Sequence, residues 1–355
     1  MVRSRSPYME WAKHRAKPAI DLAGSNLLAC SLDDLPGARE ALDISGESPN
    51  GYLPLVEAIA ARYGVGPGNV ATAVGCSGAN FLTLAALVGT ADEVLLERPG
   101  YDPLAAAATM LGATVSRFDR RFEEGYRLDP DAIRRAITSR TRVVIVSNPH
   151  NPSGVAATRQ EMVAIGRLAE KRGVTVLADE VYLDLVPGGA PAATLSPAFV
   201  STNSLTKAYG LASLRCGWSV APPEVTEKIR RERDVVDVWS AIPADRISVV
   251  AFRNIDRLAE RAQRLLARNA SLVREFVDSR AELECVPSSA TIAFPRFRDG
   301  RDARSFVAKL FEDHGVAVVP GSFFDAPSHF RIAFGGATET VEKGLEAIAA
   351  CLEDS

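Results

Sequence analysis

The sequence of 355 residues lacks the patterns that mark metal, disulfide-rich and membrane proteins. Its five cysteines are scattered without a CxxC pair, and its four histidines form no cluster such as HExxH. We therefore expect reduced thiols and no metal site. No apolar run approaches the ~20 residues needed to cross a bilayer, and the basic N-terminal stretch lacks the apolar core of a signal peptide. These absences predict a cytoplasmic protein with no membrane partner.

Charge of one sign is also scarce, because 41 basic residues face 44 acidic ones and leave a net charge of -3. This balance gives no reason to expect a nucleic-acid partner. A chain of 355 residues with 47% hydrophobic composition can bury a large core. The length predicts two domains, or one large α/β domain with an appendage.

Helical patterns alternate with short runs rich in Val, Ile and Leu between about residues 50 and 220, as in strands joined by helical crossovers. Because these runs show little alternation of apolar and polar residues, both faces of the sheet should be covered by helices. We expect a large domain at 45–240 and a smaller α+β domain from 1–44 and 241–355. The expected strands are 70–74, 93–97, 114–118, 143–147, 174–178 and 200–204, and the helices between them are 54–63, 79–88, 103–111, 130–137 and 159–171.

The most informative stretch is SLTKAYGLASLRCGW, residues 204–218. Lys207 follows a strand-like run among small, apolar and aromatic residues, which favours a cleft at a strand end over the usual surface position of lysine. An amine attacks an aldehyde only when it is neutral, and burial or nearby positive charge lowers its pKa. Arg215 could supply that charge and could also bind a phosphate, together with the hydroxyls of Ser204 and Thr206.

Two other polar segments follow strand-like runs. Asp179 ends VTVLAD and precedes Tyr182 by three residues. An aspartate there either caps the next element or keeps a pyridine nitrogen protonated, with Tyr182 at the phenolic oxygen of the same ring. Asn151 lies in SNPHNPSG, residues 147–154. That segment is either a plain turn or a loop that directs the Asn151 amide toward a cofactor and a substrate carboxylate.

A short glycine-containing turn and a tyrosine complete the set of candidates. Gly75, Cys76 and Ser77 in GCSGAN precede a helical run, and backbone amides at a helix N-terminus bind phosphate, although such turns are common. Tyr101 in RPGY either stacks on a flat ring or is an ordinary half-buried tyrosine. Each segment alone is a weak indication of function.

Together these segments resemble the class I/II aminotransferases, the pyridoxal 5′-phosphate (PLP) enzymes of fold type I, from about residue 22 to residue 352. The spacing of the polar residues makes the resemblance specific. The matched pairs are Asn151 and Asp179, which are 28 residues apart, Asp179 and Tyr182 in Asp-x-x-Tyr, and Ser204 and Lys207 in Ser-x-x-Lys, with Arg215 eight residues further on.

The resemblance implies an α/β fold: a large domain with a mixed, mostly parallel sheet covered by helices on both faces, plus a smaller α+β domain. It implies PLP as cofactor, held by Lys207 as a Schiff base, with Tyr101 stacked on its ring. The backbone of Gly75, Cys76 and Ser77 would bind the cofactor phosphate.

For the substrate, the resemblance implies that Arg331 in HFRIAFG binds the α-carboxylate and that Gly24 in DLAGSN makes a backbone contact nearby. The strand pattern agrees, because Arg331 alternates with apolar neighbours. The implied reaction moves an amino group between an L-amino acid and a 2-oxo acid, with Lys207, Asp179 and Tyr182 as catalytic residues.

The resemblance also implies a homodimer with shared active sites. Here the sequence departs from the family pattern, because Gly46 or Glu47 stands where the family usually carries a tyrosine that binds the partner's phosphate. Either Tyr52 substitutes from a different backbone position or this contact is missing. Other carbanion chemistry on the same fold, such as C–S lysis, β-elimination, racemisation or oxidation, stays an alternative. A non-catalytic PLP-binding module would instead show a damaged lysine or a fused helix-turn-helix domain.

Overall fold

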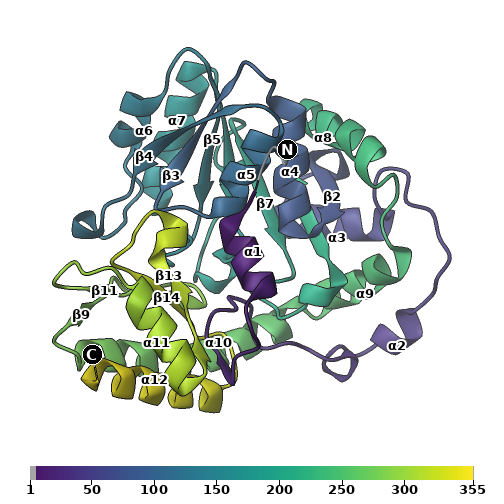
Figure 1. The fold of residues 1–355 in the computed structure, drawn as a ribbon. Coiled ribbons are helices and arrows are strands. Elements are labelled where there is room, and N and C mark those ends of the chain that lie inside the picture. The colour runs from purple at the N-terminus through teal and green to yellow at the C-terminus, as the bar shows by residue number, and fades with distance from the viewer. Residues whose placement is uncertain (1–4, 355) are drawn as a thin grey trace.

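The computed structural model describes residues 5–354, which are built around a seven-stranded sheet (Figure 1). The strand order is β2-β8-β7-β6-β5-β3-β4. Neighbouring strands from β4 to β7 are parallel, and β8 is antiparallel to both of its neighbours. This confirms the expected mixed, mostly parallel sheet. The strands are β2 (Val70–Val74), β3 (Glu93–Arg98), β4 (Thr114–Asp119), β5 (Thr141–Ser147), β6 (Thr175–Asp179), β7 (Phe199–Ser204) and β8 (Cys216–Val220).

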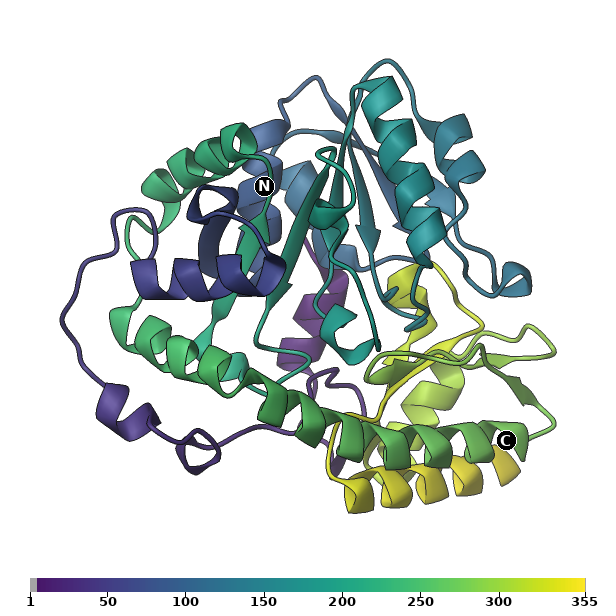
Figure 2. The same cartoon turned by 180° about the vertical axis from the view of Figure 1, so that it is seen from behind.

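Helices cover both faces of this sheet (Figures 1 and 2). Successive residues of a strand point to opposite faces, so Val143 and Ile145 of β5 pack on one side while Val144 and Val146 pack on the other. The first side is covered by α4 (Gly75–Leu87), α5 (Asp102–Met110) and α8 (Pro223–Val236). The second is covered by α6 (Pro130–Ala136) and α7 (Arg159–Arg172). Burial on both faces explains why these strands read as continuous apolar runs.

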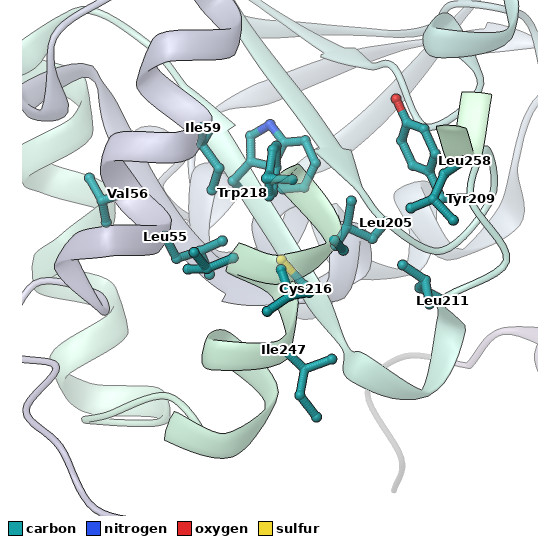
Figure 3. Close-up of a cluster of buried hydrophobic side chains, with 14 of the residues drawn as sticks. Leu55, Val56, Ile59, Leu205, Tyr209, Leu211, Cys216, Trp218, Ile247 and Leu258 are labelled. Carbon is teal, nitrogen blue, oxygen red and sulfur yellow. The ribbon is translucent and has the colours of Figure 1, made fainter. Parts of the chain in front are cut away.

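A third apolar cluster joins α3 (Leu53–Tyr63), β8 and α9 (Ile242–Arg253). Figure 3 shows Leu55 and Ile59 of α3 near Trp218 of β8, with Ile247 of α9 below them. Residues beyond 240 therefore pack against the same cluster as α3. The domain boundary expected at residue 240 stays a prediction.

The smaller part of the molecule contains short strands covered by long helices (Figure 2). The N-terminal segment joins it, because β1 (Ile20–Asp21) pairs in parallel with β12 (Val316–Ala317). The other strands are β9 (Leu283–Glu284), β10 (Ile292–Ala293), β11 (Arg296–Phe297), β13 (Val319–Pro320) and β14 (Phe330–Ala333). The remaining helices are α1 (Pro7–His14), α2 (Ala38–Ala41), α10 (Ile255–Asp278), α11 (Arg304–His314) and α12 (Thr338–Glu353). Within residues 5–354, no helix has the length and apolarity that a membrane span requires.

Two features of the large sheet differ from the expectations. Helix α4 begins at Gly75 rather than at residue 79, and β8 was not among the expected strands. Strand β8 is short and contains Gly217, a residue that weakens strand patterns. The glycine is required by packing, since a Cβ at position 217 would lie 2.2 Å from the carbonyl carbon of Gly75. The backbone at the start of α4 thus occupies the space that a side chain at position 217 would need.

A buried ion pair links the end of β3 to the residue that follows β4, and hydrogen bonds extend it to the end of β5. Arg120 donates to Glu97 at 3.0 Å, and both side chains are fully shielded from solvent. Glu97 also accepts a hydrogen bond of 2.7 Å from the Ser147 amide and another from the Ser147 hydroxyl. Arg120 further donates to the carbonyl of Tyr126 at 2.7 Å. Burial raises the pKa of Glu97, and the charge of Arg120 opposes that rise.

Replacing Arg120 with methionine should lower the free energy of unfolding by about 3–5 kcal/mol, because it leaves the Glu97 carboxylate buried without its counter-ion. Urea unfolding of the apoprotein measures the loss. The control is Arg98→Ala, which breaks the half-exposed pair between Arg98 and Asp119 one residue away on each strand. That pair should be worth no more than about 1 kcal/mol. An equal loss of unfolding free energy in the two variants would contradict a stabilising role for the buried Glu97–Arg120 pair.

Candidate active site

A cavity of about 330 Å³ opens at the carboxyl ends of the central strands. Ser147, Asp179 and Ser204 line it from the ends of β5, β6 and β7. Strand ends in open α/β sheets are the usual place for a ligand. Helix α1 and residues 24–26 add to the wall, so the N-terminal segment helps to enclose the cavity. The other lining residues are Tyr8, Met9, Ala12, Gly24, Ser25, Asn26, Cys76, Ser77, Tyr101, Asn151, Val181, Tyr182, Thr206, Lys207, Ala212 and Arg215.

Ten of the twelve site residues predicted from the sequence line this cavity, and Gly75 and Arg331 do not. Both of these lie directly behind lining residues. Gly75 adjoins the Arg215 guanidinium, and Arg331 donates to the Asn151 side chain at 2.9 Å. The fold therefore brings all twelve to one place, although their side chains come from segments far apart in the sequence.

Lys207 is accessible only in part, from the cavity side. Its Nζ donates to the Ser25 hydroxyl at 2.9 Å and to the Asn26 side-chain oxygen at 2.8 Å. Desolvation lowers the Lys207 pKa to about 8, and the positive charge of Arg331 acts in the same direction. Arg215, which the sequence pointed to as the source of that charge, contributes less than Arg331. The amine is thus neutral in a larger fraction of molecules near neutral pH than that of a solvated lysine.

Asp179 is 6% exposed at the end of β6, where it adjoins the cavity. Burial raises its pKa, while hydrogen-bond donors and the charge of Lys207 oppose this effect. The donors are Asn80 Nδ2 at 2.8 Å, the Val181 amide at 3.3 Å and the Cys76 thiol at 3.5 Å. A carboxylate held in this way can pair with a protonated ring nitrogen.

Tyr182 and Thr206 carry hydroxyls suited to a polar ligand. Both side-chain oxygens are buried, and neither makes a hydrogen bond of normal geometry within residues 5–354. Burial raises the pKa of Tyr182 to about 12, so its hydroxyl stays protonated at neutral pH and can donate. Buried polar groups without partners are uncommon in proteins, which fits a site that takes up a polar molecule.

The start of α4 and Arg215 form a site suited to a phosphate. Gly75 has a φ of +69°, and a Cβ there would lie 2.2 Å from Arg215 Nη2. Only glycine therefore allows the guanidinium to lie beside the helix N-terminus. The amides of Cys76 and Ser77 belong to the first turn of α4, where N–H groups lack helical partners and the helix dipole favours an anion. Together, the polar groups of this cavity match the chemistry of PLP, which carries a phosphate, a ring nitrogen, a phenolic oxygen and an aldehyde.

Arg331 of β14 is a fully buried cation. It donates to Asn151 at 2.9 Å, to the Tyr8 hydroxyl at 2.8 Å and to the Ala23 carbonyl at 3.1 Å. The rings of Tyr8 and Phe324 pack against it, at 5.5 and 5.1 Å from Cζ to the ring centroid. No carboxylate of the part of the chain described here forms an ion pair with it, and its Nε has no hydrogen bond there. A buried unpaired cation is costly, so the site is suited to an anionic ligand.

The polar residues of this site that were not among the predicted site residues include Ser25, Asn26, Asn80 and Ser147. Ser25 and Asn26 directly follow Gly24, so the DLAGSN segment contained the only available indication. Ser147 accepts a hydrogen bond from the Asn151 amide at 2.9 Å and connects the Asn151 loop to Glu97. Asn80 lies five residues after Gly75 in a helix that otherwise reads as apolar.

Known proteins resemble this chain in both sequence and fold. Residues 36–348 match the family model described as aminotransferase class I and II. Capreomycidine synthase of Streptomyces vinaceus is 35% identical over 298 residues, which cover 82% of this chain and 77% of that protein. Aspartate aminotransferase of Geobacillus stearothermophilus is 26% identical over 86% of this chain and 83% of that protein. A PLP-dependent aminotransferase from Streptococcus suis shares the fold with a TM-score of 0.93, at 24% identity over 100% of this chain and 99% of that one.

The pKa of Lys207 gives a kinetic prediction. An amine must be neutral to attack an aldehyde, so the rate at which the apoprotein reacts covalently with PLP should rise with pH around a midpoint of about 8. A solvated lysine would give a midpoint of about 10.4. Stopped-flow absorbance measures the rate. Arg331→Gln removes a neighbouring positive charge and should move the midpoint upward, whereas a wild-type midpoint near that of a solvated lysine would refute the role of burial.

Proposed function

The chain belongs to the class I and II aminotransferases, and from this membership we propose that Lys207 is the lysine that carries its pyridoxal 5′-phosphate. The reaction of the family moves an amino group between an amino acid and a 2-oxo acid. The observation that carries the residue assignment is the arrangement of three groups at one cavity. Lys207, a lysine of lowered pKa, and Asp179, a buried carboxylate, line it, and the buried unpaired guanidinium of Arg331 lies directly behind Asn151 in its wall.

The cofactor-binding residues divide by the part of the molecule that they would hold. Arg215, Ser204 and the amides of Cys76 and Ser77 would bind the phosphate, whereas the Gly75 amide, also predicted for this role, already donates to the Arg215 carbonyl at 2.7 Å. Asp179 would keep the ring nitrogen protonated. Tyr182 and Asn151 would donate to the phenolic oxygen. Tyr101 would stack on the ring, and its own ring already meets that of Tyr8 edge-on at 5.8 Å. When bound, the cofactor supplies an electron-withdrawing ring that acidifies the α-hydrogen of an amino acid.

The substrate residues follow from charge and position. Arg331 would bind the α-carboxylate through its fork of N–H groups, with Asn151 and the backbone near Gly24 beside it. Binding of the carboxylate in this way determines which bond at the α-carbon is aligned for cleavage. Lys207 Nζ would then accept the α-proton as general base, a role that a lysine pKa near 8 favours.

A second candidate function keeps the same residues but changes the outcome after proton removal. It is favoured by one observation, namely that the 35% identical relative is named a synthase rather than an aminotransferase. Elimination or replacement at the substrate side chain would start with the same Lys207 base and the same Arg331 grip. The outcomes differ in the fate of the amino group. Transamination retains it on the enzyme, elimination releases it as ammonia, and replacement leaves it on the product amino acid.

The holoenzyme mixed with an L-amino acid and no oxo acid should release one equivalent of 2-oxo acid per active site and then stop, as a ping-pong reaction requires. A panel of amino acids, with assays of both oxo acid and ammonia, measures this. Ammonia release with continuing turnover would contradict transamination and favour the second function. The variant that tests the substrate site is Arg331→Lys, which should keep the bound-cofactor spectrum. Its kcat/KM should fall by a factor that corresponds to a loss of about 2–4 kcal/mol of transition-state stabilisation. Loss of PLP with normal substrate affinity would reverse the roles of Arg215 and Arg331.

We also propose a homodimer with shared active sites. Two segments carry large apolar side chains to the surface, among them Ile44, which is 88% exposed, and Val235, which is 83% exposed. The segments are adjacent, because the Ser48 and Ser240 hydroxyls are hydrogen-bonded at 2.8 Å. Grouped apolar side chains of this size are typical of an interface. Tyr52 is the N-cap residue of α3 in the same region. Both alternatives for it, a contact with the partner's phosphate or the absence of that contact, stay untested.

Light scattering should give twice the 38.0 kDa mass of one chain. Ile44→Asp combined with Val235→Asp should shift the mass toward one chain, because the charges would have to be buried at the interface. The pair Val235→Ala and Ile44→Ala controls for loss of side-chain size. A single-chain mass for the wild type at micromolar concentration would contradict the dimer.

A further inference from the structure

The side chain of Asn80 lies between two buried polar groups from different strands. Its Nδ2 donates to Asp179 Oδ2 at 2.8 Å, and its Oδ1 accepts from the Thr202 hydroxyl at 2.5 Å. The three residues come from α4, β6 and β7, and none of them is more than 6% exposed. The contact therefore connects the helix that begins at the phosphate site with the carboxylate proposed to face the ring nitrogen.

The two contacts fix which way the amide points. An ionised carboxylate accepts hydrogen bonds only, so Asp179 requires the NH2 end of Asn80. The Thr202 hydroxyl can then donate to the remaining oxygen of the amide. The Ala178 carbonyl is a second acceptor for that hydroxyl, but at 3.3 Å it is the longer contact. The reversed amide would place its oxygen against Asp179, an arrangement that suits only a protonated carboxyl group.

Asn80 is not explained by the packing of its helix. Helix α4 is otherwise largely apolar and is buried against β8 and β7. A buried amide in that setting costs about 1–3 kcal/mol unless its polar atoms are paired. Here both ends are paired, and one partner is the buried Asp179. Among the groups that oppose the effect of burial on the Asp179 pKa, Asn80 has the largest effect.

We propose that Asn80, oriented by Thr202, is a positioning residue that holds Asp179 in its ionised form and thereby keeps the cofactor ring nitrogen protonated. This inference rests on the proposed function, because it assigns Asp179 to the ring nitrogen. Asn80 itself touches Asp179 and not the reacting atoms. Removal of the Asn80 side chain should change the protonation of the ring nitrogen and not the binding of the substrate.

The test uses holoenzyme prepared with PLP labelled with ¹⁵N in the ring. The ¹⁵N chemical shift reports the protonation of that nitrogen independently of turnover. In Asn80→Leu the resonance should move toward the unprotonated position at pH 7.5, and the apoprotein should bind PLP about 10- to 100-fold more weakly, the range for losing a hydrogen bond to a charged group. In Thr202→Val, where the amide loses its orienting donor, the resonance should move in the same direction by a smaller amount.

The control is Thr83→Val on the same helix. Thr83 is also fully buried, and its hydroxyl is hydrogen-bonded to Ser219 at 3.1 Å, away from Asp179. That variant should leave the nitrogen resonance unchanged. An unchanged resonance in Asn80→Leu would overturn the inference. If Asn80→Leu fails to fold or to bind PLP, Thr202→Val decides, and a wild-type resonance there overturns it equally.

The same spectra separate this inference from the function on which it rests. A wild-type protein with an unprotonated ring nitrogen, or without covalently bound PLP, would refute the roles of Asp179 and Lys207. A protonated wild-type nitrogen that is insensitive to Asn80 and Thr202 would leave those roles intact and remove only the role of Asn80.

Discussion

Burial of charge beside a single cavity is the constraint on which the rest of the site depends. Asp179 and Arg331 are shielded from water, and Lys207 reaches solvent only through the cavity. Charged groups in such a setting change their pKa or require partners. The pKa of Lys207 is lowered to about 8, whereas the ionised form of Asp179 is stabilised by hydrogen-bond donors. Arg331 has neutral partners only, and its unpaired charge is the basis of the proposal that it binds a substrate carboxylate.

The scaffold meets this constraint by bringing strand ends and helix starts together. Parallel strands end at one edge of the sheet, which places Ser147, Asp179 and Ser204 side by side. The antiparallel strand β8 approaches the start of α4 closely enough that only glycine fits at 217, and the guanidinium of Arg215 leaves no room for a side chain at Gly75. Beneath the Asn151 loop, the Glu97–Arg120 pair holds Ser147 in place. Buried polar contacts therefore fix the position of the site residues, in addition to the packing of the apolar core.

The sequence predicted the parts of this arrangement that depend on local order. Asp179 and Asn151 follow apolar runs and Lys207 follows a strand-like run, so their placement at strand ends could be predicted. The central strands were found within two residues of their observed ends. Strand β8 was missed because a five-residue run with an internal glycine lacks a strand pattern. Asn80 and Ser25 were missed for another reason. Their partners Asp179 and Lys207 are 99 and 182 residues away, and no periodicity reports such a contact.

The central claim is that Lys207 carries the cofactor, and covalent mapping tests it most directly. The purified holoenzyme is reduced with borohydride, digested with a protease and analysed by mass spectrometry. We predict the reduced pyridoxyl group on the peptide that contains Lys207, at close to one group per chain. A label on Lys13, Lys17 or any other lysine, or no label on a protein that is saturated with PLP, would contradict it.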